Sequence, residues 1–279
     1  MSVARVAALF VHPLKSAAAI AVGSITLDER GAEGDRRWML VDANGIAITA
    51  RTQHALALIQ PAFLGADRNG ALELRAPHLA PCVVAVPVSA PVRTVTIWDD
   101  EVPALDAGDM AAEWCSAAVG VSSRLMRLAE GARRPLQPKY AGALPFESRQ
   151  VMLSDGAPLL LLAAASIDAL NARLMERGEQ AVDVARFRPN VLIEGVVPHE
   201  EDTWREVVIG AVHIGVGSPC PRCVMTTVDP RTGEGGVEPL RTLAGYRRDE
   251  TGVVFGMNAT HAGVGVIRVG DAITVRALR

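Results

Sequence analysis

The sequence predicts a mainly β fold with some α structure (α+β), organised as β-barrels. Short apolar or alternating segments with strand character recur along the chain, whereas only two stretches have helical composition. Glycine and proline, at 25 and 17 of the 279 residues, interrupt these segments throughout. A chain of this length, 49% hydrophobic and 21% charged, has ample core for one large domain or two of ordinary size.

The first part of the chain is rich in expected strands, which run between Gly and Pro breakers. They are expected at residues 3–11, 20–27, 37–41, 46–50, 83–88 and 92–98. The Asn44-Gly45 pair suits a tight turn with positive φ, so residues 37–50 are expected to form a hairpin. A helix is expected over residues 111–119, with Asp109 as its N-terminal cap.

The second part begins with residues 130–150, whose prolines and positive charges indicate a linker or mobile loop. The apolar run over residues 157–167 is too short to span a bilayer and leads into a helical pattern over 170–175. Further strands are expected at residues 191–193, 207–209, 212–216, 264–269 and 272–275. Residues 224–228 also have a strand pattern.

Charge and cysteine content limit the class of protein. The formal net charge of −3 gives no bias toward nucleic acid or anionic lipid, so neither is expected as a partner. Cys82 and Cys115 are isolated and Cys220 and Cys223 are clustered, which suits a reducing compartment better than a disulfide framework. No charged-then-apolar leader opens the chain. A cytoplasmic protein is therefore expected.

The pair Cys220 and Cys223 permits several interpretations. A structural zinc site needs four ligands, but this is one pair, and His213 and His261 lack ligand-like spacing. A redox pair would open a helix, whereas a strand pattern follows here. Both cysteines could also be small buried hydrophobes. These three alternatives stay open beside a fourth, in which a single thiolate binds a soft metal or carries sulfur.

The neighbours of the cysteines favour the single thiolate. Arg222 is a positive charge that favours the thiolate form of an adjacent cysteine. Pro219 and Pro221 stiffen the backbone and are expected to present Cys223 in a fixed direction.

Several basic clusters indicate an anion-binding pocket. Arg186 and Arg188 lie two residues apart, so in a strand they would share a face, which Asn190 continues. Adjacent guanidinium groups suit bidentate phosphate contacts. Taken singly, these arginines, Lys15-Ser16 and Asp35-Arg36-Arg37 could be ordinary solvated ion pairs; their combination favours a site. No phosphate loop, dinucleotide fingerprint or nucleophile elbow is present, which disfavours nicotinamide or ATP chemistry.

These segments together resemble the MOSC family. Residues 220–243, 255–258 and 265–271 look like the MOSC domain found at the C-terminus of molybdenum cofactor sulfurases. Residues 11–16, 35–38 and 49–51 resemble the β-barrel domain that precedes it in the branch of the amidoxime-reducing components and their bacterial relatives. The resemblance implies an N-terminal β-barrel-like domain over residues 1–120 and a MOSC β-barrel domain over 121–279.

The resemblance also implies a cofactor and its ligands. The cofactor is the molybdenum cofactor, a molybdopterin whose metal is bound by Cys223, which is also the expected catalytic residue. Residues matching the family's cofactor contacts are Lys15, Ser16, Arg36, Arg188, Asn190, Ser218, Pro221, Arg222 and Thr226. The chain departs from the pattern at Gly156-Ala157, where some relatives carry hydroxyl side chains. At family level, an association with pyridoxal phosphate is also implied.

The activity implied by the resemblance is reduction of small N-hydroxylated compounds to their N–H forms. Some bacterial relatives end in a fused ferredoxin domain, and no cysteine cluster here follows the last expected strand. Electrons are therefore expected from a separate protein of ferredoxin or flavin reductase type. The alternative is a molybdenum cofactor carrier or a sulfur-transfer module that uses Cys223.

Overall fold

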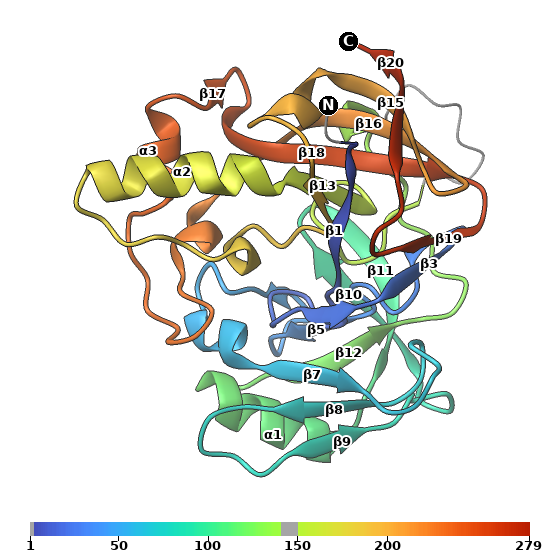
Figure 1. Cartoon of the computed structure of the whole chain (residues 1–279). Coiled ribbons are helices and arrows are strands. Elements are labelled where there is room, and N and C mark those ends of the chain that lie inside the picture. The colour runs from blue at the N-terminus through green and yellow to red at the C-terminus, as the bar shows by residue number, and fades with distance from the viewer. Residues whose placement is uncertain (1–2, 141–149) are drawn as a thin grey trace.

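Most of the chain folds into four β-sheets with three short α-helices, as the computed structural model shows (Figure 1). The structure describes residues 3–140 and 150–279. The mainly β, α+β class is therefore confirmed.

The largest sheet combines strands from both ends of the chain. Its order is β2 (Ile20–Val22), β1 (Arg5–Val11), β14 (Val191–Glu194), β13 (Leu159–Ala163), β18 (Gly252–Ala262), β16 (Val212–Pro221), β15 (Trp204–Ile209) and β20 (Ile273–Leu278), with β17 (Arg248–Asp249) paired to β18. The Arg5–Ala272 bridge and the hydrogen bond from Ile273 N to Ala4 O connect β1 to the start of β20. This contact curls the sheet toward a barrel around the core of Val6, Leu9 and their neighbours.

The other three sheets are smaller. The five-stranded sheet has the order β10 (Val92–Ile97), β11 (Asp100–Asp106), β12 (Arg124–Leu128), β5 (Trp38–Val41) and β6 (Ala47–Ile48). The two three-stranded sheets are β19 (Gly265–Arg268), β3 (Ser24–Asp28) and β4 (Gly31–Ala32), and β7 (Gln60–Phe63), β8 (Leu72–Arg75) and β9 (Cys82–Val84). Because β19 pairs with β3, the two parts of the chain share a sheet here as well. The boundary near residue 120 stays a prediction.

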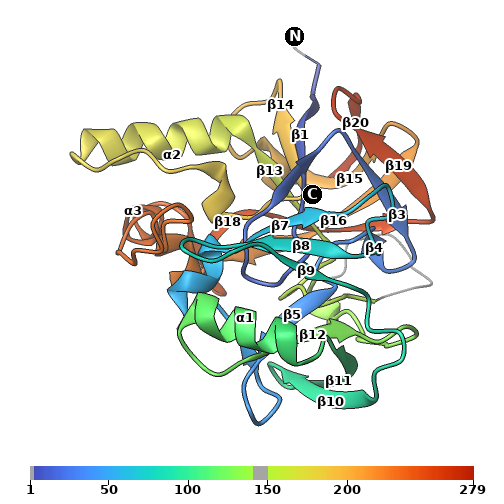
Figure 2. The ribbon, with the colours of Figure 1, turned by 90° about the horizontal axis from the view of Figure 1, so that it is seen from below.

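The helices cover the sheets at two places (Figure 2). The α-helices are α1 (Asp109–Val119), α2 (Ala164–Glu176) and α3 (Leu240–Ala244), and the 3-10 helices are η1 (His54–Leu58), η2 (Pro138–Tyr140), η3 (Val184–Arg186), η4 (Glu200–Thr203) and η5 (Val224–Thr227). Helix α1 packs against the β7–β8–β9 sheet and β12 through Ala111, Cys115 and Val119. Helix α2 links the parallel strands β13 and β14, and packs with α3 against Phe187 and Phe255.

Three local predictions are wrong. Asp109 is the first residue of α1 rather than its cap, because its carboxylate accepts a hydrogen bond from Arg124 while Gly108 takes the cap position. Residues 224–227 form η5 instead of a strand. Arg186 ends η3 and Arg188 has a φ of 56°, so the two arginines do not share a strand face.

The predicted 130–150 linker is anchored in its described part; residues 141–149 lie outside the described residues. Arg134 is buried, and its guanidinium forms an ion pair of 2.7 Å with Asp100. It also donates to the carbonyl oxygens of Met152 and Ser154, at 3.0 and 2.5 Å. Arg134 therefore anchors the backbone of residues 152–154, immediately before Asp155.

Candidate functional site

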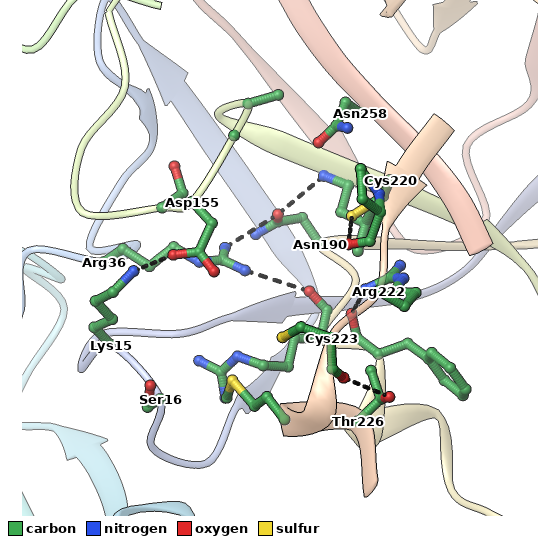
Figure 3. Close-up of a pocket in the computed structure, with 18 of the residues that line it drawn as sticks. Lys15, Ser16, Arg36, Asp155, Asn190, Cys220, Arg222, Cys223, Thr226 and Asn258 are labelled. Carbon is green, nitrogen blue, oxygen red and sulfur yellow. Dashed lines mark hydrogen bonds and ion pairs between the residues drawn. The ribbon is translucent and has the colours of Figure 1, made fainter. Parts of the chain in front are cut away.

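A cavity of about 130 Å³ lies where several distant parts of the chain meet (Figure 3). Its wall is formed by the loop after β1, the 153–160 segment, the η3–β14 connection and the end of β16 with η5, together with Arg36 before β5, Arg51 after β6 and Asn258 on β18. All the predicted site residues except Ser218 line it. Ser218 lies on β16 two residues before Cys220 and is not part of the wall.

On one side, a buried lysine and a carboxylate form the centre of a hydrogen-bond network. Lys15 Nζ donates to Leu153 O at 2.8 Å and forms an ion pair with Asp155. Arg51 Nη2 and Trp98 Nε1 also donate to Asp155, at 2.9 and 3.2 Å. Burial lowers the pKa of Lys15, and Asp155 counteracts part of that effect. Burial would raise the pKa of Asp155, but Lys15 and Arg51 outweigh it and hold this pKa below its ordinary value.

Next to this network, two guanidinium groups lie close together. Arg36 pairs with Asp35 and donates to Asn190 Oδ1 at 3.2 Å and to Arg188 O at 3.3 Å. Arg188 donates to Ala17 O, while its Nη2 is buried and has no partner among the described residues. Burial, and then the charge of Arg36, lower the pKa of Arg188 to about 9. An anionic ligand would relieve both effects.

Three residues that line the cavity have left-handed backbones. The φ angles of Ser16, Arg36 and Arg188 are 69°, 47° and 56°. A non-glycine residue rarely adopts this conformation, which costs about 1–3 kcal/mol and tends to occur at functional sites. The backbone at these three positions therefore adopts strained conformations that strand pairing does not require.

The two cysteines enter the cavity from a bulged strand end. The pairing of β16 with β18 shifts register after Val216 and again after Pro219, where bulges can redirect side chains. Both thiols are free and half-buried. Burial raises the pKa of Cys220, and Arg222 only partly offsets this. Among residues 3–140 and 150–279, no group of three or more His, Cys, Asp or Glu side chains converges, so the zinc alternative lacks further protein ligands.

The guanidinium that contacts the Cys223 sulfur is Arg51, not Arg222. Arg51 Nε lies 3.2 Å from Cys223 Sγ, and the Arg51 guanidinium stacks 4.2 Å from the Trp98 ring centroid. Arg222 instead donates to Phe187 O at 2.9 Å and to Phe255 O at 2.8 Å. Arg222 thus braces the wall, and Arg51 supplies the positive charge expected beside the thiol.

The remaining predicted residues hold the wall in place. Thr226 is buried, and its backbone N and Oγ1 both lie 3.0 Å from Cys223 O, which fixes the turn after the cysteine. Asn190 is buried, accepts from Leu160 N at 3.2 Å and donates to Phe10 O at the same distance. Pro221 lines the cavity at the end of β16.

Sequence reasoning gave no role to Arg51, Asp155, Trp98 or Asn258. Arg51 and Asn258 stand inside motifs that carried the resemblance, but only the structure shows their contacts. Gly156 also lines the cavity: a Cβ there would lie 3.1 Å from the Tyr140 ring and 3.2 Å from Asn258 Oδ1. A larger side chain would thus require movement of its neighbours.

The charges of the wall define the class of ligand. Six cationic side chains line the cavity against one carboxylate among the described residues: Lys15, Arg36, Arg51, Arg186, Arg188 and Arg222 against Asp155. Such an excess favours a ligand with several negative charges, and the thiol of Cys223 adds a donor suited to a soft metal. These features fit an anionic small molecule that carries a soft metal.

Comparison with known proteins identifies the family. Residues 3–122 match the MOSC N-terminal beta barrel domain and residues 148–274 match the MOSC domain. The mouse mitochondrial amidoxime-reducing component 1 is 32% identical over 97% of this chain and 82% of its own length. The rat amidoxime reducing component 2 is 31% identical over 97% of this chain and 83% of its own length. The chain belongs to the MOSC family.

A second kind of relative matches more narrowly. The molybdenum cofactor sulfurase of Drosophila mojavensis is 33% identical over 86% of this chain but only 30% of its own length. The printed name of this relative includes the molybdenum cofactor, and together with the MOSC domain it points to an association of this family with that cofactor. In the described part of the chain, no helix is long and apolar enough to cross a membrane.

Proposed function

We propose that the cavity binds the molybdenum cofactor and that the protein reduces N-hydroxylated compounds to their N–H forms. The observation that carries this proposal is the position of Cys223 Sγ at the edge of a cavity lined by cationic side chains. Similarity to amidoxime-reducing components over nearly the whole chain supports the reaction.

The residues present fit the cofactor. A phosphate with terminal oxygens would satisfy the unpartnered Nη2 of Arg188 and offset its repulsion with Arg36. Lys15 and Ser16 lie in the same wall and would add donors to it. Cys223 would bind the metal as a thiolate. Asn190, Thr226 and the backbone at Gly156-Ala157 would orient the pterin part.

The proposed reaction is a two-electron reduction. The substrate R–NHOH takes up two electrons and two protons and gives R–NH2 and water. The bound cofactor would supply the two-electron centre. The protein would bind and orient the cofactor and the substrate, and would exclude competing ligands. Arg51 holds the Cys223 sulfur in position through its contact and its stacking on Trp98. The electrons would come from a separate donor protein of ferredoxin or flavin reductase type.

The test separates the two cysteines. Wild-type protein, Cys223→Ser and Cys220→Ser are produced in a host that makes molybdopterin, and molybdenum is measured by mass spectrometry. Reduction of phenylhydroxylamine and hydroxylamine is followed with a reduced viologen as the electron source. Wild type and Cys220→Ser should contain near-stoichiometric molybdenum and be active, and Cys223→Ser should be inactive. Full activity in protein from a cofactor-deficient host would refute the proposal.

A second function is favoured by the sulfurase relative and by the partial exposure of the Cys223 thiol. In this case the protein is a cofactor carrier or sulfur-transfer module, and Cys223 holds a persulfide or passes the cofactor on. Wild-type protein would then lack tightly bound molybdenum or release it to an acceptor, and cyanide would release sulfur from it as thiocyanate. A cytoplasmic location and the family-level link to pyridoxal phosphate stay predictions.

A further inference from the structure

A second cavity, of about 210 Å³, adjoins the proposed cofactor cavity. Ser16, Arg186, Arg188 and Met225 line both cavities, so these four residues form the border between them. Arg186 is fixed at this border by an ion pair of 3.0 Å with Asp229 and a hydrogen bond of 3.3 Å to Thr226 O. Arg188 is fixed there through its bond to Ala17 O.

The second cavity differs in chemistry from the first. Seven of its lining residues are alanines, three of which, Ala17, Ala18 and Ala19, directly follow Lys15-Ser16. Phe10, Val228 and Pro230 complete an apolar wall, and no acidic residue lines it among the described residues. Among the described residues that line it, the charged groups are Arg186 and Arg188, at the border with the first cavity.

The second cavity exists because its wall carries small alanine side chains on a backbone that hydrogen bonds hold in place. Ala17 N donates to Leu14 O at 3.2 Å and Ala18 N to Ile59 O at 2.9 Å. These bonds tie the alanine run to the loop after β1 and to the end of η1, so the wall cannot simply collapse inward. An apolar cavity of about 150 Å³ is large enough to accept benzene. The second cavity therefore has room for an aromatic ring with a small substituent.

We propose that this cavity binds the apolar group of the substrate while the N–O group extends into the first cavity. The inference rests on the proposed function and specifies its substrate class: N-hydroxylated compounds with one compact apolar group, aromatic or branched aliphatic, and no negative charge on that group. Apolar walls with a few polar groups at one end are typical of sites that fix the orientation of a small ligand.

The test fills the cavity from two sides. Ala18 and Ala185 are both half-buried and line it from the loop after β1 and from η3, so Leu can be introduced without displacing a fully buried side chain. Ala169→Leu on α2 is the matched control, because Ala169 is also half-buried and lines neither cavity. Molybdenum content is measured for every variant.

Two substrates that differ only in the apolar group give the readout. For Ala18→Leu and Ala185→Leu, kcat/KM for phenylhydroxylamine should fall at least tenfold more than kcat/KM for hydroxylamine, since pocket contacts of this size discriminate by about 10–200-fold. Ala169→Leu should leave the ratio of the two unchanged. Equal losses for both substrates would overturn the inference, and so would loss of molybdenum in both cavity variants, which would show that the cofactor itself occupies the space.

A binding measurement separates this inference from the proposed function. Protein labelled with ¹³C at alanine methyl groups is titrated with aniline, the product of phenylhydroxylamine reduction. Saturable shifts of alanine methyl signals in wild type, absent in Ala18→Leu, would support binding of the apolar group in the second cavity even if neither compound is reduced. Absence of shifts in wild type would overturn the inference even if reduction is observed.

Discussion

Replacing Arg188 with methionine should stabilise the protein without its cofactor while abolishing cofactor retention. Burial, and then the charge of Arg36, lower the pKa of Arg188 to about 9, well below the ordinary value of an arginine. At about 1.4 kcal/mol per pKa unit, holding this charge in the ligand-free fold costs roughly 5 kcal/mol. Methionine keeps the apolar stem but loses the bond to Ala17 O, which costs about 1–3 kcal/mol. The unfolding free energy should therefore rise by about 2–4 kcal/mol.

The pH dependence follows from the direction of the shift. Because the folded-state pKa is lowered, the free-energy penalty of the buried charge is complete below about pH 9 and disappears as the pH rises toward the ordinary pKa of an arginine. The advantage of Arg188→Met should therefore be constant between about pH 6 and 8.

The assay is urea unfolding of protein from a cofactor-deficient host, followed by circular dichroism at pH 7. The control is Arg124→Met, because Arg124 pairs with Asp106 and Asp109 and its pKa is raised by these bonds. Arg124→Met should lose about 1–3 kcal/mol. Inorganic phosphate at 100 times its Kd should stabilise wild type by about 2.7 kcal/mol but not Arg188→Met. If both variants lose stability alike and phosphate has no effect, the reasoning about an anion site is wrong.

Three further outcomes are expected. Arg51→Met should slow alkylation of Cys223 by iodoacetamide several-fold in cofactor-free protein, since Arg51 is the cation in contact with this sulfur; unchanged rates, read by peptide mass spectrometry, would contradict this. Cys115 and Cys82 should stay unlabelled at pH 8 until the protein unfolds, because both are buried and burial raises the pKa of Cys115 to about 12 and also raises that of Cys82. Burial raises the pKa of Glu201, so the cost of its buried charge is absent below pH 4.5 and grows above it; wild type should lose stability relative to Glu201→Gln as the pH rises above 4.5, and parallel urea-unfolding profiles would exclude this.

The sequence predicts strands best where apolar residues are continuous or where a turn is specified. The run at β1 and the hairpin of β5 and β6 were both predicted, and Leu40 does pair with Ile48. Strand β18 was missed, although almost all of it is buried between β13 and β16. Its Gly256, Asn258 and His261 break the apolar pattern. Gly256 is required by packing, since a Cβ there would lie 2.8 Å from Leu161 O.

Within the site, residue types were more predictable than contacts. The basic residues and the cysteines of the site could be predicted because their combination in one chain is unusual. Asp155 was missed because its role depends on Lys15, 140 residues away, and on Arg51, 104 residues away. The left-handed backbone of Arg188 could not be predicted from a pattern that suggested a strand.

The backbone and the charges of the cavity favour a ligand independently of the family resemblance. Ser16, Arg36 and Arg188 adopt left-handed backbones that glycine would adopt more easily, yet each carries a side chain that lines the cavity. Hydrogen bonds hold one of these positions: Arg36 N donates to His12 O at 2.7 Å, and Leu153 N donates to Arg36 O at 3.1 Å. Neither the strained backbone nor the repulsion between Arg36 and Arg188 stabilises the fold. An anion between the two guanidinium groups would offset the cost of the strained backbone and of the charge repulsion together. Such costs in the ligand-free protein are expected of a site that is preorganised for its ligand.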